Sequence, residues 1–342
     1  MKKKKLLAAA IVLCMVIQLL CACGKQKISM SDKVYVGVTC YDQNDTFLSE
    51  LLVCFKEELN HLNKNGVETT VTVKNAAGSQ RTQNDQVKEL INAGCNVLCV
   101  NLVDRADPSE IIDVAKEHDV PIIFFNREPV AEDMRQWDRL YYVGADAKQS
   151  GVLQGELAVE MIRQNSQIDH NKDGKIQYVV LEGEAGHQDA IIRTENAVDT
   201  LNKNGIELEK LSYQIANWNR AQAQNRMEQM LGQYKNKIEL VLANNDMALG
   251  ALDAYKNLNY TEALLPVFIG IDGTDMGLKA VEDSSMAGTV YNDKEGQARA
   301  IAKLSAALVI GKEAEEIKFT NENYIYLPYS KVTKENVHEY LK

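Results

Sequence analysis

The strongest constraint on the fold is a regular alternation between short apolar, largely β-branched runs and longer segments with helical spacing of apolar residues. Segment 47–62 carries large apolar residues at helical intervals, and Gly66 follows to end it. Strands that are buried on both faces and separated by helices form a parallel, doubly wound α/β sheet. The strand-like runs are 34–40, 70–73, 97–103, 121–125, 141–143, 176–181, 238–242, 266–271 and 287–291.

The chain is long enough for two such units. Its 342 residues exceed what one hydrophobic core usually serves, so two domains are expected. Residues 62–68, Leu-Asn-Lys-Asn-Gly-Val-Glu, are echoed by residues 201–207, Leu-Asn-Lys-Asn-Gly-Ile-Glu. Each copy ends a helical segment with a glycine and leads into a strand. The echo favours two similar α/β lobes, although Asn-Lys-Asn-Gly alone is a common turn.

The N-terminus has the pattern of a bacterial lipoprotein signal peptide. Lys2 to Lys5 form a charged region, and an apolar stretch from Leu6 to Leu20 follows that is short for a spanning helix. Leu20-Cys21-Ala22-Cys23-Gly24 resembles a lipobox, which predicts cleavage before Cys23 and a lipid on its sulfur. Cys21 fits less well, because bulky Leu20 precedes it, and an uncleaved membrane anchor is the alternative. Either arrangement places the body outside the cytoplasm, attached to the cell membrane.

The body of the chain is acidic. The whole sequence has a formal net charge of −10, and removing residues 1–22 removes four lysines and no acid. Such a surface repels phosphate backbones, so we expect no nucleic-acid partner.

Four cysteines follow the predicted lipid site: Cys40, Cys54, Cys95 and Cys99. Most lie in or beside apolar runs, which predicts buried thiols. A Cys95–Cys99 disulfide is the alternative in an oxidising compartment, but a strand would hold the two residues too far apart. No spacing of Cys and His indicates zinc.

Polar and aromatic side chains follow the ends of six predicted strands. Ligands of doubly wound folds bind at these carboxyl ends. No Gly-x-Gly-x-x-Gly follows a strand and no Gly-Lys-Ser/Thr occurs, so a phosphate-binding loop is not indicated. The residues at the strand ends are Tyr41, Asp45 and Phe47, then Asn126, then His187, Asp189 and Arg193, then Asn244, Asn245 and Asp246, then Asp272, and finally Asn292 and Asp293.

Planar Asp, Asn and Arg groups suit the hydroxyls of a sugar, because each hydroxyl both donates and accepts hydrogen bonds in fixed directions. Aromatic planes cover the C–H faces of a sugar ring. Phe47 and Trp218 are candidates, since Trp218 stands in the polar stretch Ala-Asn-Trp-Asn-Arg.

Simpler roles are open for several of these residues. Asp45 and Asp272 could each cap the helix that follows. His187 could be a solvated loop residue, and Phe47 has the spacing of a core residue. A glycosidase that uses Asp45 and Asp272 as its two carboxylates is a further alternative.

Residues 169–180, Asp-His-Asn-Lys-Asp-Gly-Lys-Ile-Gln-Tyr-Val-Val, resemble an EF-hand calcium loop up to the last position. Asp169, Asn171 and Asp173 occupy loop positions one, three and five, Lys175 would offer its carbonyl, and Gln177 would offer its side-chain oxygen. Position twelve should be a bidentate Glu and is a valine. Either the loop binds no metal, or the missing carboxylate comes from elsewhere in the chain.

Over nearly all of residues 33–342 the chain resembles the periplasmic D-galactose/D-glucose-binding proteins, the type I periplasmic binding proteins that serve methyl-galactoside ABC transporters. The calcium loop separates these receptors from most ribose- and arabinose-type relatives. The resemblance rests on the stretches 41–47, 84–86, 101–104, 124–129, 141–144, 169–177, 183–190, 243–246 and 287–293.

The resemblance implies specific roles. Hydrogen bonds to the sugar would come from Asp45, Asn126, His187, Asp189, Arg193, Asn245, Asp272 and Asn292, and Phe47 and Trp218 would sandwich the ring. The sixth calcium ligand would be Glu239. Without the resemblance, the sequence around Glu239 predicts an exposed acidic residue at the start of a strand. The resulting Ca²⁺ would be structural, held by Asp169, Asn171, Asp173, Lys175, Gln177 and Glu239. Arg127 and Thr46 depart from the family pattern, and so does Gln188, where relatives usually have proline. These departures leave the preferred hexose open.

The resemblance also implies the organisation and the partners. A signal peptide (1–22) and a tether (23–32) would precede an N-terminal lobe (33–144 and 293–327) and a C-terminal lobe (145–292 and 328–342), joined by three crossings. We expect a monomeric receptor, not an enzyme, that delivers D-galactose or D-glucose to the permease and ATPase of an ABC transporter. The alternative is a sugar sensor that docks on a chemoreceptor or sensor kinase.

Overall fold

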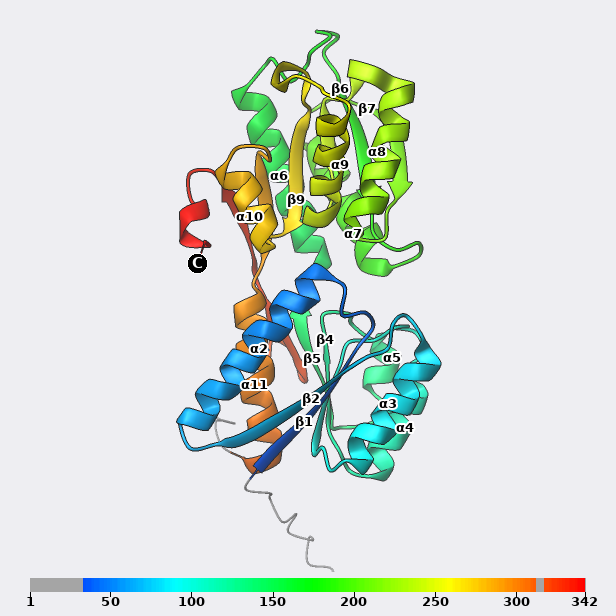
Figure 1. Ribbon diagram of the computed structural model, residues 1–342, viewed down its shortest axis with the longest axis vertical. Coiled ribbons are helices and arrows are strands. Elements are labelled where there is room, and N and C mark those ends of the chain that lie inside the picture. Colours follow the sequence, from blue (N-terminus) through cyan, green and yellow to red (C-terminus); the bar gives the residue numbers. More distant parts are fainter. Residues whose placement is uncertain (1–32, 312–316, 342) are drawn as a thin grey trace, which may run out of the picture. The chain divides into compact units, whose positions relative to one another are not determined.

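The structure, a computed structural model, describes residues 33–311 and 317–341. The predicted signal peptide, the tether, the lipidation site Cys23 and the last residue of the predicted C-terminal lobe lie outside this described part. The described chain forms two six-stranded sheets, here called sheet A and sheet B, each flanked by helices on both faces (Figure 1). The predicted α/β fold with two doubly wound lobes is therefore confirmed.

Sheet A has the strand order β11-β5-β4-β3-β1-β2, and all its neighbouring strands run parallel. Its central strands are buried along their whole length, as expected when helices cover both faces. The strands are β1 (Lys33–Cys40), β2 (Glu68–Asn75), β3 (Val97–Val100), β4 (Ile122–Phe125), β5 (Leu140–Ala145) and β11 (Tyr324–Leu327).

Sheet B repeats this order as β12-β10-β9-β8-β6-β7. Only β12 departs from the parallel direction, because the chain enters it from the end of β11 and so runs antiparallel to β10. The strands are β6 (Ile176–Glu182), β7 (Leu208–Ile215), β8 (Leu240–Leu242), β9 (Val267–Asp272), β10 (Gly288–Asn292) and β12 (Tyr329–Thr333).

Two hydrophobic layers enclose each sheet. On sheet A, α2 and α11 pack on one face and α3 and α4 on the other; on sheet B, α8, α9 and α10 cover one face and α6 and α7 the other (Figure 1). We call sheet A with its helices lobe A and sheet B with its helices lobe B. The helices are α2 (Thr46–Lys64), α3 (Gln80–Asn92), α4 (Ser109–Glu117), α5 (Ala131–Met134), α6 (Ala147–Gln164), α7 (Gln188–Lys203), α8 (Arg220–Tyr234), α9 (Asn245–Asn257), α10 (Asp275–Glu282) and α11 (Lys294–Ile310), with 3₁₀ turns at Lys235–Lys237, Glu262–Leu264 and Val337–Glu339.

The described chain passes between the sheets at three places. It leaves β5 of sheet A through Asp146 into α6, leaves β10 of sheet B through Asp293 into α11, and leaves β11 of sheet A through Pro328 into β12. All three passages lie next to the carboxyl ends of parallel strands, where doubly wound folds bind their ligands.

The repeated Asn-Lys-Asn-Gly sequence has the same geometry in both lobes. Gly66 and Gly205 follow the ends of α2 and α7 with φ of 84° and 78°. The amide of Val67 donates to the carbonyl of Leu62 at 3.0 Å, and the corresponding bond from Ile206 is 3.2 Å. A left-handed glycine after a helix closes the last turn in this way. The repeat thus marks equivalent β–α–β units.

The four cysteines of the described part are buried, with no disulfide between Cys95 and Cys99. Burial raises the pKa of Cys40 and Cys99 to about 12, so both are neutral thiols. None of the helices within residues 33–311 and 317–341 has the length and apolarity needed to span a bilayer.

Candidate functional site

The carboxyl ends of strands from both sheets border one cavity, with a volume of about 40 Å³. Its lining follows β1 and β4 of sheet A and β6 to β9 of sheet B. The lining residues are Tyr41, Asp45, Phe47, Asn126, Arg127, His187, Asp189, Arg193, Trp218, Asn244, Asp246, Asp272 and Thr274.

All but two of the residues predicted to contact a ligand line this cavity. Those that do are Asp45, Phe47, Asn126, His187, Asp189, Arg193, Trp218 and Asp272. They come from five separate strand ends, so the fold brings together side chains that are up to 227 positions apart in the sequence, from Asp45 to Asp272.

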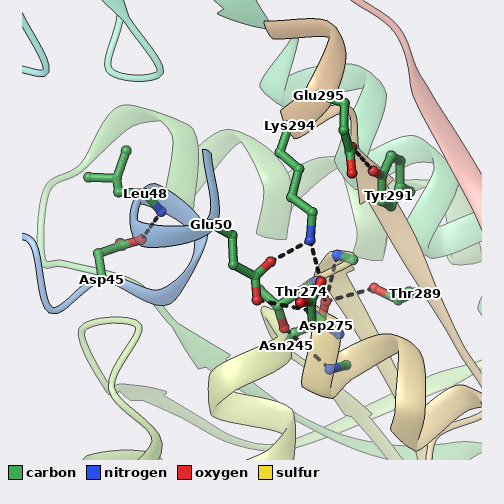
Figure 2. A network of polar contacts seen from close by, with 12 residues as sticks. Asp45, Leu48, Glu50, Asn245, Thr274, Asp275, Thr289, Tyr291, Lys294 and Glu295 are labelled. Atoms are coloured by element: carbon green, nitrogen blue, oxygen red, sulfur yellow. Dashed lines mark hydrogen bonds and ion pairs between the residues drawn. The ribbon is translucent and has the colours of Figure 1, made fainter. Parts of the chain in front are cut away.

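The two exceptions, Asn245 and Asn292, lie outside the cavity lining. The amide oxygen of Asn245 accepts hydrogen bonds from the backbone of Gly273 at 2.6 Å and of Thr274 at 3.2 Å, and the side chain is fully buried (Figure 2). The oxygen of Asn292 accepts from the amide of Gln297 at 2.6 Å. In this structure Asn245 therefore holds the backbone turn beside the cavity, whereas Asn292 binds the side chain of Gln297 in α11, and neither asparagine lines the cavity.

Sequence reasoning did not select five of the lining residues: Tyr41, Arg127, Asn244, Asp246 and Thr274. Tyr41, Asn244 and Asp246 were already visible at strand ends. Asn244 precedes α9 and lines the cavity. Asn245, the first residue of α9, has its side chain buried inside lobe B.

Asp45 caps a helix, as the sequence allowed, and also lines the cavity. One carboxylate oxygen caps α2 by accepting from the backbone amide of Leu48 at 2.9 Å (Figure 2). The other accepts from the hydroxyl of Tyr41 at 2.6 Å. The helix cap fixes the carboxylate at the cavity wall, so its position is set before any ligand arrives.

Two aromatic residues supply apolar surface. Phe47 is 6% exposed and belongs to the core of lobe A as well as to the cavity wall. The indole of Trp218 lies directly against Gly183, where a Cβ would come within 2.2 Å of the ring. Asn217 and Trp218 both have φ of 52°, a left-handed conformation that asparagine adopts readily but that is unusual for a bulky tryptophan. The strained loop places the Trp218 ring at the cavity.

His187 carries two buried ring nitrogens that have no hydrogen-bond partner among the described residues. Burial, together with the positive charges of Arg127 and Arg193, lowers its pKa to about 3. The ring is therefore neutral, with one donor and one acceptor nitrogen. It packs edge-on against Trp218, with ring centroids 4.9 Å apart. A buried polar group without a partner is costly, so a ligand hydroxyl in the cavity would relieve this deficit.

Arg127 joins the two lobes at the cavity. Its guanidinium carbon lies 3.4 Å from the centre of the Tyr41 ring, a close cation–π contact. One of its nitrogens donates to Glu184 of lobe B at 3.0 Å, and another to the carbonyl of Val103 at 3.2 Å. Its side chain is 5% exposed, so its charge is shielded from solvent.

Two carboxyl groups of lobe B have strongly perturbed pKa values. Burial raises the pKa of Asp272 to about 7, although Arg193 and Asn244 act in the opposite direction. Burial likewise raises the pKa of Asp246 to about 6. Asp272 accepts from the amide of Asn244 at 2.9 Å, and Asp246 accepts from the hydroxyl of Thr46 in lobe A. Both groups can thus change protonation near neutral pH.

Arg193 forms a fixed cation on the lobe B side. Burial alone would lower its pKa, but Tyr329, Asp189 and Asp272 raise it above the usual value. The guanidinium donates to the hydroxyls of Ser150 at 3.2 Å and Tyr329 at 3.1 Å. With its remaining donors it can hold a ligand oxygen in a defined direction.

The predicted calcium residues also lie together. Glu239, which precedes β8, reaches the loop and accepts from the backbone amides of His170 at 2.6 Å and Gln177 at 3.0 Å. It is 1% exposed, and burial raises the pKa of its carboxyl despite these hydrogen bonds. A buried carboxylate beside an oxygen-rich loop matches the donor preference of a hard cation.

The loop of residues 169–177 is otherwise satisfied by its own hydrogen bonds. Asp169 accepts from the amide of Gly174 at 2.9 Å, and Asp173 accepts from the amide nitrogens of Asn171 and Gln177 at 3.0 and 2.9 Å. Within the described residues no cluster of three or more His, Cys, Asp and Glu side chains is arranged to hold a metal. A calcium site here would therefore depend on amide and carbonyl oxygens turning toward the ion.

The two-lobed fold with a polar cavity at its strand ends defines a small-ligand binding protein. The chain belongs to the periplasmic binding proteins: the family model described as a periplasmic binding protein domain matches residues 36–313. This family consists of binding proteins rather than enzymes, and its members act outside the cytoplasm. The family resemblance inferred from the sequence is confirmed.

Individual relatives narrow the comparison. The chain is 37% identical to the D-galactose/methyl-galactoside binding periplasmic protein MglB of Haemophilus influenzae, over 94% of this chain and 96% of that protein. It is 30% identical to a putative rhizopine-binding protein of Rhizobium meliloti, over 84% and 90% of the two chains. Among solved structures, an ABC transporter solute binding protein from Bacillus halodurans with bound myo-inositol has a TM-score of 0.74 at 26% identity, covering 90% of this chain and 97% of that one.

Proposed function

We propose that this chain is an extracytoplasmic substrate-binding lipoprotein that captures D-galactose or D-glucose in the cavity and delivers it to an ABC sugar transporter. The cavity itself carries the proposal. It combines carboxylates, amides and guanidinium groups with two aromatic rings and a neutral His187 whose ring nitrogens are unpartnered. The similarity to MglB supports a hexose as the ligand.

Each class of side chain has a task in such a site. The carboxylates of Asp45, Asp189 and Asp272 accept from sugar hydroxyls, while Arg193 and the amide of Asn126 donate to them. Phe47 and Trp218 cover the C–H faces of the ring. No pair of these groups needs to attack or protonate the sugar, so the site can bind without chemistry.

Closure of the lobes about the three crossings would enclose the sugar. A Kd in the micromolar range corresponds to a binding free energy of about −8 kcal/mol, and a tighter Kd to a more negative value. Such an affinity is reasonable for a small polar ligand enclosed by both lobes. The enclosed form then presents a surface that a permease can distinguish from the open form.

Thermal unfolding with a panel of sugars tests the proposal. A ligand that binds only the folded protein at 100 times its Kd stabilises it by about 2.7 kcal/mol, which raises Tm by about 5 °C for a chain of this size. We expect such shifts with D-galactose, D-glucose or methyl-galactoside and smaller ones with D-ribose. Unchanged Tm values, together with calorimetry that shows no heat of binding for every hexose tested, would refute the proposal.

We also propose that residues 169–177 and Glu239 hold a structural Ca²⁺. The support is the placement of Glu239 at the loop, although the two are separated by more than sixty residues. The ion would tie the loop to the start of β8 in lobe B. It would lie apart from the sugar cavity, since none of these residues lines it.

A lipid on Cys23 would keep the receptor at the membrane near its transporter. The support is the sequence Leu20-Cys21-Ala22-Cys23-Gly24 after a charged and apolar leader. Mass spectrometry of the protein purified from membranes would show a diacylglyceryl adduct on Cys23. A mature N-terminus at another residue, without lipid, would contradict this assignment.

A further inference from the structure

A cluster of charged residues joins the two lobes beside the cavity, outside its lining. It consists of Glu50, Lys294 and Asp275 (Figure 2). The ammonium group of Lys294 pairs with the carboxylates of Glu50 and Asp275, the latter at 2.7 Å. The backbone amide of Asp275 donates to the second oxygen of Glu50 at 3.0 Å. The three residues thus form a closed set of hydrogen bonds.

The members of the cluster come from different lobes. Glu50 lies on α2 and Lys294 begins α11, both of lobe A, whereas Asp275 is the first residue of α10 in lobe B. The amide of a first helical residue has no partner within its helix, and the helix dipole favours a negative charge there. Glu50 therefore caps a helix of the opposite lobe. This bond can exist only while the lobes are together.

Lys294 occupies a position that helix preferences do not explain. A cation in the first turn of a helix opposes the helix dipole. Its side chain is only 5% exposed, and a buried ammonium group needs compensating charge. The two carboxylates provide that compensation, one from each lobe. Opening the lobes would leave the lysine with Glu50 alone.

A short turn connects the cluster to the cavity. Asp272 and Thr274 line the cavity, and Asp275 follows at once. Asp272 and Gly273 have φ of 109° and 65°, and the buried side chain of Asn245 holds the turn by accepting from its backbone amides. The position of Asp275 is therefore fixed relative to the residues that would contact a ligand.

We infer that Glu50, Lys294 and Asp275 form an interlobe latch that positions lobe B over lobe A and sets how long a bound sugar is retained. The identity of the bound sugar rests on the proposed function. The contacts of the latch between the two lobes do not depend on which ligand is bound. Because its bonds form only after closure, it acts on dissociation far more than on the first encounter with the sugar. The three are positioning residues, since none of them lines the cavity.

Stopped-flow fluorescence of Trp218 with D-galactose and D-glucose measures both rates. We expect Glu50→Ala and Lys294→Met to accelerate dissociation about tenfold or more. Association should become faster by less than about threefold, because the latch holds only part of the ligand-free wild type closed. The matched control is Lys331→Met. Lys331 also pairs with two carboxylates, Glu160 at 2.6 Å and Glu156 at 3.3 Å, but all three lie within lobe B. This control should leave both rates within about twofold.

Three further measurements keep the inference falsifiable. Glu50→Gln, which keeps the shape of the side chain, should show a smaller acceleration than Glu50→Ala. The Tm of the ligand-free variants shows whether they fold. Small-angle X-ray scattering of the ligand-free proteins should give a larger radius of gyration for Lys294→Met than for the wild type and for Lys331→Met.

The outcomes separate the latch from the proposed ligand. If neither sugar binds but Lys294→Met opens the protein in solution, the latch stands and the proposed function fails. If the sugars bind and the latch variants dissociate at the wild-type rate, the latch is refuted and the proposed function stands. Identical scattering combined with absent sugar binding refutes both.

Discussion

Replacing Asp272 by asparagine should make the ligand-free protein more stable at alkaline pH while weakening sugar binding. Burial raises the pKa of this carboxyl from 3.8 to about 7. The folded state therefore binds the proton more tightly than the unfolded chain, and wild-type stability falls as the pH rises from about 4 to about 7. A rise of this size in the pKa corresponds to about 4 kcal/mol at most. Water in the ligand-free cavity reduces this value, so we expect about 1–3 kcal/mol.

Urea unfolding at pH 4.5, 6 and 8 measures this effect. Asp272→Asn cannot titrate, so its advantage over the wild type should grow with pH and level off above pH 7. His187 has the opposite dependence, because its lowered pKa removes stability as the pH falls below 6.5. That contribution is common to both proteins and cancels in the difference. A difference in unfolding free energy that is constant from pH 4.5 to pH 8 would refute the reasoning.

Two further predictions concern the ring of Trp218 and the loop at Glu239. Trp218→Ala should reduce the sugar-induced Tm shift to near zero and leave the Tm of the ligand-free protein within about 3 °C of the wild type, because the ring packs on Gly183 at the cavity wall. A large loss of ligand-free stability would show instead that Trp218 is a core residue. If the loop holds Ca²⁺, a chelator should lower the ligand-free Tm of the wild type but not of Glu239→Gln, and calcium titration should give a saturable heat only for the wild type. Equal chelator effects on both proteins, or no calcium heat, would remove the ion from the proposal.

The fold could be predicted because buried parallel strands are continuous apolar runs. β3, β4 and β8 are buried along their whole length, and the sequence shows each as an unbroken hydrophobic stretch. The sequence of β7 is not a continuous apolar run, because β7 lies at the edge of sheet B and its residues are partly exposed. Only the repeated Asn-Gly turn indicated that a strand follows there. The last two strands, β11 and β12, were expected only as a crossing, because Pro328 interrupts them.

The cavity could be predicted as a set of strand ends, but the direction of each side chain could not. Asn244 and Asn245 are adjacent, and the start of α9 decides which of them faces the ligand space. The sequence does not show on which residue a strand stops and a helix begins. Arg127 was noticed only as a departure from the family pattern. Its stacking on Tyr41 and its bond to Glu184 depend on the meeting of two lobes, which no local pattern encodes.

The order of strands along the chain has a consequence for biosynthesis. β11 is an edge strand of sheet A and β12 is an edge strand of sheet B, yet both follow every other described strand along the chain. Until these two strands have been synthesised, each sheet lacks an outer strand. Both lobes therefore depend on the same late segment to complete their sheets.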